Sequence, residues 1–143
     1  MIEESIRIRP AVLAAIEQHA RAAAPAECCG LLIAGDGCID EARAVENQAA
    51  DPERHYEVSP RDYIEALKRC RGTDRIVIGA YHSHPRSMPE PSATDREAAF
   101  SDFLYLIAGP VGGGRDLVIR AYRLKDGNFR PIGLVPDPRE PQT

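Results

Sequence analysis

Aromatic residues are scarce in this 143-residue sequence: tryptophan is absent, and aromatic residues make up only 6% of the chain. A core must therefore be built mainly from Ile, Leu, Val and Ala, and the 43% hydrophobic content suffices for one domain. No apolar run approaches the length of a membrane span, and the N-terminus lacks the apolar segment of a signal peptide. We therefore expect a cytoplasmic protein that does not bind membranes.

An excess of positive charge and paired cysteines are lacking as well. Lys and Arg number 18 against 22 Asp and Glu, a net charge of −4, and no basic patch predicts nucleic-acid binding. Four cysteines, Cys28, Cys29, Cys38 and Cys70, form neither a CxxC motif nor a disulfide framework. We expect them to pack as small apolar side chains, and for Cys29 packing is favoured over a reactive role.

Strands and helices mix along the chain. Hydrophobic periodicity, prolines and turn residues predict helices over 10–24, 61–71 and 93–101 and strands over 27–35, 38–45, 75–84, 103–108, 117–124 and 129–135, with a short strand at 55–58. Turn signals at 36–37 and 125–128 predict two hairpins, and hence a mixed, partly antiparallel sheet. We therefore expect an α/β fold with a sheet flanked by helices, in a single domain over 1–135, followed by a disordered tail over 136–143.

The most informative stretch runs from the end of the strand predicted at 75–84 into the following helix. His82 and His84 are two residues apart in a strand, so their side chains share one face. Three prolines between 85 and 91 force the chain out of the sheet, and Asp95 falls in the first turn of the next helix. Two imidazoles and one carboxylate at one point suit Zn²⁺, although iron or manganese could compete for the same ligands.

Each half of this pattern also has a simpler interpretation. A His-x-His strand end is a weak signal by itself, because polar strand ends carry histidines for many reasons. Ser92-x-x-Asp95 matches a capping box, in which the acid bonds back to the helix N-terminus. The two halves rarely occur together by chance, however, and a capping carboxylate can still ligate a metal with one oxygen. The combination therefore favours a metal site.

Three protein ligands would leave one position of a tetrahedral zinc site for water, as in catalytic sites. Zinc lowers the pKa of such a water and polarises a carbonyl group, but a base must still move the proton. The leading candidate is Glu27, at the mouth of an otherwise apolar strand, with a solvated strand-edge charge as the alternative. The hydroxyl groups of Tyr81, Ser83, Ser87 and Thr94 are candidate hydrogen-bond partners for the ligands.

Together these residues resemble the motif of the JAMM, or MPN-plus, metallopeptidases: a distant Glu, then H-x-H, seven residues and S-x-x-D. The resemblance implies a cytidine-deaminase-like α/β/α sandwich with one catalytic zinc on His82, His84 and Asp95. It also implies that Glu27 is the general acid and base and that Ser92 bonds the oxyanion of the tetrahedral intermediate. The short CCGLL form of the motif resembles the compact bacterial members. We therefore expect hydrolysis of an amide or isopeptide bond after the C-terminal glycine of a ubiquitin-like or sulfur-carrier protein.

Two other functions stay open at this point. A non-catalytic module that binds a ubiquitin-like tail would share the fold, but inactive relatives typically lack ligands, and here the set is complete. A zinc nucleobase deaminase requires H-x-E followed by P-C-x-x-C, and the sequence contains neither. The sequence leaves open which substrate is cut and whether the protein forms a homo-oligomer.

Overall fold

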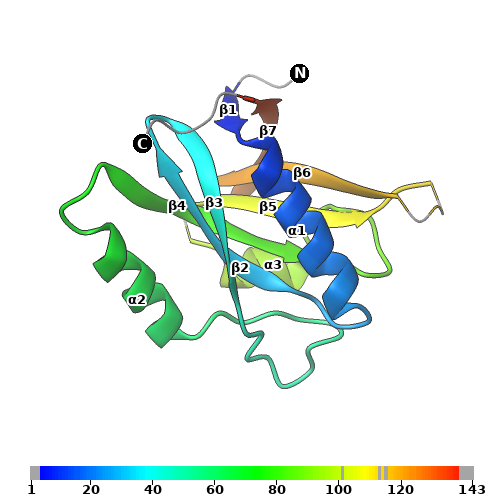
Figure 1. Ribbon diagram of the computed structural model, residues 1–143. Helices are drawn as coiled ribbons and strands as arrows, with labels where there is room; N and C mark the ends of the chain where they lie inside the picture. Colours follow the sequence, from blue (N-terminus) through cyan, green and yellow to red (C-terminus); the bar gives the residue numbers. More distant parts are fainter. Residues whose placement is uncertain (1–3, 101, 113, 115, 139–143) are drawn as a thin grey trace.

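The computed structural model describes residues 4–100, 102–112, 114 and 116–138. The elements follow one another (Figure 1) as β1 (Glu4–Ile8), α1 (Pro10–Ala23), β2 (Cys29–Gly35), β3 (Cys38–Val45), α2 (Pro60–Cys70), β4 (Arg75–Ser83), α3 (Ala93–Ala98), β5 (Leu104–Pro110), β6 (Leu117–Lys125) and β7 (Asn128–Pro136). Apart from β1 and 55–58, these elements lie within a few residues of the predicted ones. Within the described ranges, every helix is too short or too polar to cross a bilayer.

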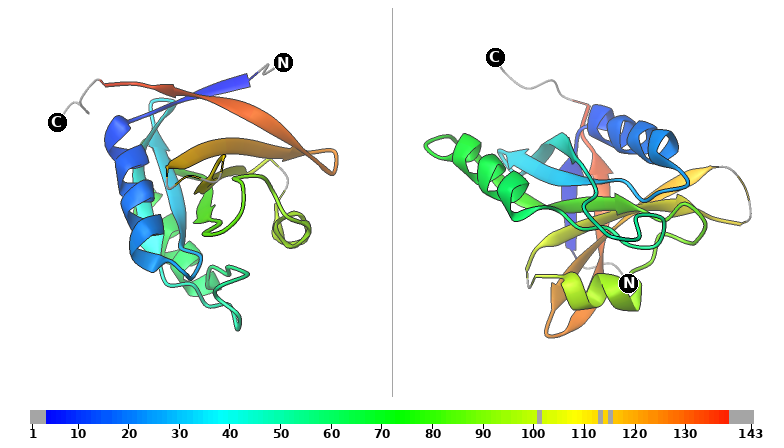
Figure 2. Two further views of the ribbon diagram at one scale, coloured as in Figure 1. Left: turned by 90° about the vertical axis from the view of Figure 1, so that its right-hand side faces the viewer. Right: turned by 90° about the horizontal axis from the view of Figure 1, so that it is seen from below.

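The strands close into a barrel in the order β1-β3-β2-β4-β5-β6-β7. Closure depends on β1, which pairs in parallel with both β3 and β7, and Figure 2 shows β1 beside β7. β4 and β5 are also parallel, and the other neighbours are antiparallel. The mixed α/β class is therefore confirmed, whereas the sheet closes instead of lying open between helix layers as the expected sandwich would. The sequence did not predict β1 because Ile8 is its one buried residue.

Helices pack on two faces of the central strands. Ile16 of α1 belongs to the main core cluster, which also contains Tyr81 of β4. Ala66 of α2 belongs to a second cluster, which contains Ala80, the residue before Tyr81. Successive residues of β4 therefore face opposite clusters, as strand alternation requires. His82 shares the face of Ala80, so it emerges on the side of the sheet that α2 covers.

The C-terminal contacts continue past the predicted domain boundary at residue 135. β7 extends through Pro136, and Asp137 is buried, with its backbone N–H donating to Ile8 O at 2.8 Å. The Asp137 carboxylate pairs with Arg7 at 3.0 Å and with Arg9 at 3.4 Å. The start of the expected tail is therefore part of the fold, and residues 139–143 lie outside the described part of the chain.

Candidate metal centre

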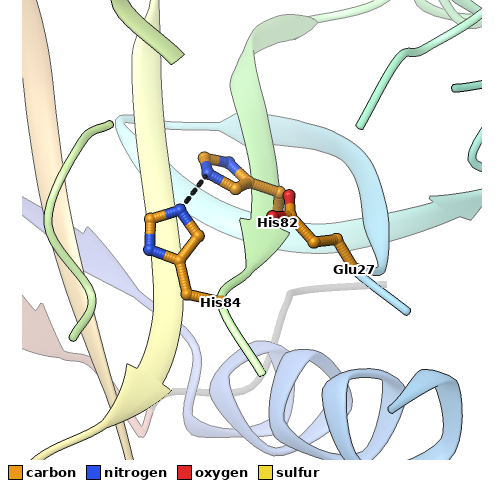
Figure 3. Close-up of side chains that lie close together, drawn as sticks. All are labelled: Glu27, His82 and His84. Carbon is orange, nitrogen blue, oxygen red and sulfur yellow. Dashed lines mark hydrogen bonds between the residues drawn. The ribbon is translucent and has the colours of Figure 1, made fainter. Parts of the chain in front are cut away.

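The end of β4 presents the two histidines. β4 lies between β2 and β5, and the ladder places His82 opposite Cys29 on one side and Ile107 on the other. His84 follows the last residue of the strand, and its N–H donates to Ala108 O at 2.8 Å. Both side chains are buried, and their Nε2 atoms lie 3.2 Å apart (Figure 3). The backbone of the sheet thus brings the two rings together.

Asp95 reaches the same point from the first turn of α3. Its Oδ2 atom lies 3.2 Å from His82 Nε2 and 3.1 Å from His84 Nε2. The same oxygen accepts the Ser92 N–H at 2.8 Å, and Ser92 Oγ accepts the Asp95 N–H at 3.0 Å. The capping box is therefore present. It holds the carboxylate against the imidazoles, so the side-chain position that caps the helix is also one from which a metal could be bound.

Two hydrogen bonds hold the loop that joins β4 to α3. His84 Nδ1 lies 2.9 Å from Met88 O. Because a carbonyl oxygen can only accept, Nδ1 carries the proton, and in the neutral ring the lone pair of Nε2 faces the centre. Tyr122 donates its hydroxyl proton to Pro89 O at 2.9 Å. A backbone carbonyl and a tyrosine from β6 therefore support this ligand and its loop.

Two of the four candidate hydroxyl groups, those of Ser83 and Tyr81, have partners other than the two histidines and Asp95. Ser83 Oγ accepts the backbone N–H of Cys28 at 2.8 Å. The hydroxyl of Tyr81 lies 2.8 Å from a histidine nitrogen of α1, on the opposite face of β4 from the centre. Ser87 and Thr94 are exposed. Which backbone groups lie near a ligand depends on the loop conformation, so the pattern of side chains did not reveal the Met88 carbonyl.

Glu27 joins the centre from a distant part of the sequence. It precedes β2, and one ligand atom from each of Glu27, His82 and His84 lies within 4.8 Å of the other two (Figure 3). The residue is only 7% exposed, which argues against a solvated strand-edge charge. Its Oε1 atom is buried without a hydrogen-bond partner among the described residues. Such an oxygen is costly to bury, and a metal or its water at the centre would remove that cost.

Burial and neighbouring charges set the protonation of the centre. Burial raises the pKa of Glu27 to about 7, with the charge of His84 opposing the shift and that of Asp95 adding to it. Burial lowers the pKa of His82. Burial also disfavours the charged forms of Asp95 and His84, but their hydrogen bonding outweighs it, so the pKa of Asp95 falls and that of His84 rises. A carboxyl group with a pKa near 7 can take up and return a proton at neutral pH.

The donor atoms fit a zinc ion. At zinc–ligand distances of about 2.0–2.1 Å, two ligands at tetrahedral corners are about 3.3 Å apart. The three separations among His82 Nε2, His84 Nε2 and Asp95 Oδ2 are 3.1 to 3.2 Å. Two imidazole nitrogens and one carboxylate oxygen are also the donor types that zinc accepts. Glu27 lies beside this triangle, where a base would be needed.

Tyr56 is a neighbour of the centre whose role the sequence did not indicate. Residues 55–58, predicted as a short strand, are not in a strand. The ring of Tyr56 instead stacks on His82, with centroids 4.1 Å apart and planes at 17°. It also lines an apolar cleft of about 280 Å³ together with Tyr63 and Tyr105. The ring that stacks on His82 is therefore also part of a surface that can accept apolar groups.

The cysteines beside Glu27 behave as core residues. Cys28 is 2% exposed and Cys29 is fully buried. Burial raises the pKa of Cys29 to about 12, and its thiol lies 3.9 Å from Val45 O. A thiol with this pKa stays protonated near pH 7 and is a poor nucleophile. The structure therefore supports packing over reactivity for Cys29.

Two imidazoles, the carboxylate of Asp95 and the buried carboxylate of Glu27 thus converge at the end of β4 as a candidate metal centre. The chain belongs to the family described as prokaryotic homologs of the JAB domain, which it matches over residues 9–125. It is 40% identical to the desampylase of Haloferax volcanii over 108 residues, 73% of this chain and 77% of that protein. It is 25% identical to the CysO-cysteine peptidase of Mycobacterium tuberculosis over 131 residues, 90% of each chain.

A solved structure shows the same fold. The solution structure of a protein from Desulfitobacterium hafniense matches this chain with a TM-score of 0.78 and 28% identity, over 92% of this chain and 94% of that one. The resemblance to compact prokaryotic JAMM proteins is therefore confirmed. The relatives' names support a hydrolase as the class of protein.

Proposed function

We propose that this protein is a zinc-dependent isopeptidase that hydrolyses the amide bond after the C-terminal glycine of a ubiquitin-like protein of the sulfur-carrier type. The observation that carries the proposal is the triangle of His82, His84 and Asp95 with the buried, unpartnered carboxylate of Glu27 beside it. The desampylase and CysO-cysteine peptidase relatives support a substrate of this class. A cytoplasmic location belongs to the same proposal.

The metal would be held by His82 Nε2, His84 Nε2 and Asp95 Oδ2. When bound there, zinc lowers the pKa of water and polarises a carbonyl group. Glu27, with a pKa of about 7, then accepts the proton of the attacking water and delivers it to the leaving amine. Glu27 thus returns to its starting protonation state after each turnover.

Ser92 would stabilise the oxyanion that forms on the substrate. Its Oγ atom already accepts the Asp95 N–H in the capping box, which fixes the position of the hydroxyl group. An O–H group can accept and donate at the same time, so its proton remains to be donated to the oxyanion. A well-placed donor of this kind contributes roughly 3 kcal/mol to transition-state stabilisation.

The apolar cleft beside Tyr56 supports a substrate that is a protein segment. Its lining residues are mainly aromatic and aliphatic, and it adjoins the ring that covers His82. Apolar pockets next to polar reacting groups are typical of sites that hold a substrate by its non-reacting parts. A carrier protein's tail could place an apolar side chain there while its terminal glycine reaches the metal.

Two variants, each with a matched control, test the proposal by zinc content and by hydrolysis. Zinc content after purification is expected to be stoichiometric in the wild type and lost in Asp95→Ala, while Thr94→Ala, an exposed neighbour in the same turn, retains it. Glu27→Gln is expected to keep zinc but to lose at least 100-fold in the hydrolysis of a carrier–lysine isopeptide conjugate. Glu97→Gln, an exposed glutamate of α3 outside the cleft, is the matched control.

Other outcomes would point to other functions. Zinc-loaded wild type that binds the carrier tail without cleaving it would favour a non-catalytic binding module. Unchanged hydrolysis by Glu27→Gln would remove Glu27 from the mechanism. Absence of bound metal after zinc is offered at neutral pH would reject the metal centre itself.

A further inference from the structure

A single side chain, that of Asn47, bonds the backbone next to two neighbours of His82, namely Glu27 and Tyr56. We infer that Asn47 is a positioning residue, whose amide group holds Glu27 and Tyr56 in one fixed arrangement around His82. The inference rests on the proposed function for its catalytic consequence. Its structural content rests on the hydrogen bonds of Asn47 alone.

Asn47 uses both ends of its amide group. Its Nδ2 donates to Glu27 O at 3.0 Å and to His55 O at 2.9 Å, and it has a longer contact with Pro52 O at 3.5 Å. Its Oδ1 accepts from Ala49 N at 3.0 Å and from Glu57 N at 3.1 Å. Five backbone groups therefore converge on one side chain: that of Glu27 and four from the segment between β3 and α2. These contacts use the two N–H donors and the accepting oxygen that an amide on a short stem provides.

Glu27 depends on these contacts for its position. Residue 27 precedes β2, which begins at Cys29, so its backbone lies outside the ladder of the sheet. Its carbonyl accepts from Asn47, and its N–H donates to Pro52 O at 2.7 Å. Both backbone groups of Glu27 are thus bonded to the segment between β3 and α2. The conformation of this segment therefore decides where the carboxylate lies.

Tyr56 depends on the same side chain. The two backbone groups that Asn47 bonds near it, His55 O and Glu57 N, belong to the peptide units on either side of Tyr56. This bracing presents the ring to His82, on which it stacks at 4.1 Å. A stacked ring restricts rotation of the imidazole. Asn47 therefore links the orientation of a metal ligand to the position of the base.

The test compares Asn47→Asp with wild type. Aspartate keeps an accepting oxygen but has no N–H to donate to Glu27 O and His55 O, so it removes the donor half of the clamp and places negative oxygen against two carbonyls. Gln48→Ala is the matched control, because Gln48 is exposed and its backbone N–H still bonds Glu57 O. Zinc affinity is measured by competition with a chelator, and kcat and KM are measured on fully loaded protein.

We expect Asn47→Asp to bind zinc about 10-fold more weakly and, when loaded, to lose about 10-fold or more in kcat with KM nearly unchanged. Tyr56→Leu, which keeps all the bonds of Asn47, should weaken zinc binding with a smaller effect on kcat. If Asn47→Asp fails to fold, the zinc affinity of Tyr56→Leu still tests whether the stacked ring supports His82. Gln48→Ala should match the wild type in both measurements.

Two results would overturn the inference. One is an Asn47→Asp protein that unfolds at a lower temperature but has wild-type zinc affinity and kcat once loaded, which would make Asn47 merely structural. The other is a Tyr56→Leu protein with wild-type zinc affinity, which would remove the link to His82. Failure of the proposed function is separate: no carrier conjugate would be cut by the wild type, while the zinc-affinity comparison would still report on Asn47.

Discussion

At the scale of the residue, the carboxyl group of Glu27 links stability to pH. In the unfolded chain this group releases its proton near pH 4.5, whereas burial keeps it protonated in the fold up to about pH 7. Between these values the folded state binds more protons than the unfolded state, so stability falls as the pH rises. The full effect, reached above pH 7, is roughly 2–3 kcal/mol for the metal-free protein.

Glu27→Gln removes the loss of stability that ionisation of this buried carboxyl group causes. In metal-free protein we expect the free energy of unfolding of the variant, relative to wild type, to increase between pH 4.5 and 7 by roughly 2–3 kcal/mol and then to level off. Urea unfolding at several pH values measures it, with Glu57→Gln as an exposed control. Parallel pH profiles for wild type and Glu27→Gln would show that the buried carboxyl group titrates normally.

At the scale of the element, the loop between β4 and α3 is pressed against β5. A Cβ atom on Gly109 would lie 2.6 Å from Ser87 O and 3.0 Å from Pro89 N, both of them backbone atoms. No side-chain rotation could relieve such contacts. This close approach lets the loop return toward α3, where Asp95 meets the histidines. Gly109 therefore helps to place Asp95 beside the histidines without contacting any of the three side chains.

Gly109→Ala should displace this loop. We expect a loss of about 1–3 kcal/mol in stability from overpacking, together with weaker zinc binding, because the carbonyl of Met88 that supports His84 belongs to the same loop. Chemical unfolding and chelator competition measure the two effects. Gly114→Ala, where the added atom would lie 3.8 Å from its nearest neighbour, is the matched control. Wild-type zinc affinity in Gly109→Ala would show that the loop can move without disturbing the ligands.

At the scale of the whole molecule, the first and last strands close the barrel. β1 pairs with β7 over five residues, from Glu4 opposite Ile132 to Ile8 opposite Pro136. Asp137 then extends the pairing through its bond to Ile8 O and its ion pairs with Arg7 and Arg9. The contacts that close the barrel therefore continue beyond residue 135. The first and last strands of the described chain thus pair with each other and leave no open sheet edge between them.

Shortening the chain tests this closure. A protein ending at residue 135 loses Pro136 and the buried Asp137, and we expect it to be about 1–3 kcal/mol less stable than one ending at residue 138. Urea unfolding should show a lower midpoint with a similar slope. Equal midpoints would mean that the predicted boundary at 135 was adequate and that Asp137 adds nothing to closure.

The sequence by itself was enough to predict that three of the candidate site residues come together. His82, His84 and Asp95 lie within one short stretch, and their convergence follows from strand alternation, proline-enforced turning and helix capping, which are local rules. The positions of most strands and helices follow from equally local periodicity. Recognition of the family motif was possible for the same reason.

The tertiary structure decided the rest. Glu27 reaches the histidines, Tyr56 stacks on His82, Asn47 bonds the backbone of Glu27, and β1 closes the barrel only because segments far apart in the chain pack together. Such contacts depend on loop conformation and strand order, which no local periodicity encodes. A short strand with one buried residue, and a loop held by backbone hydrogen bonds and one amide side chain, leave almost no pattern in the sequence. Their positions follow from tertiary packing alone.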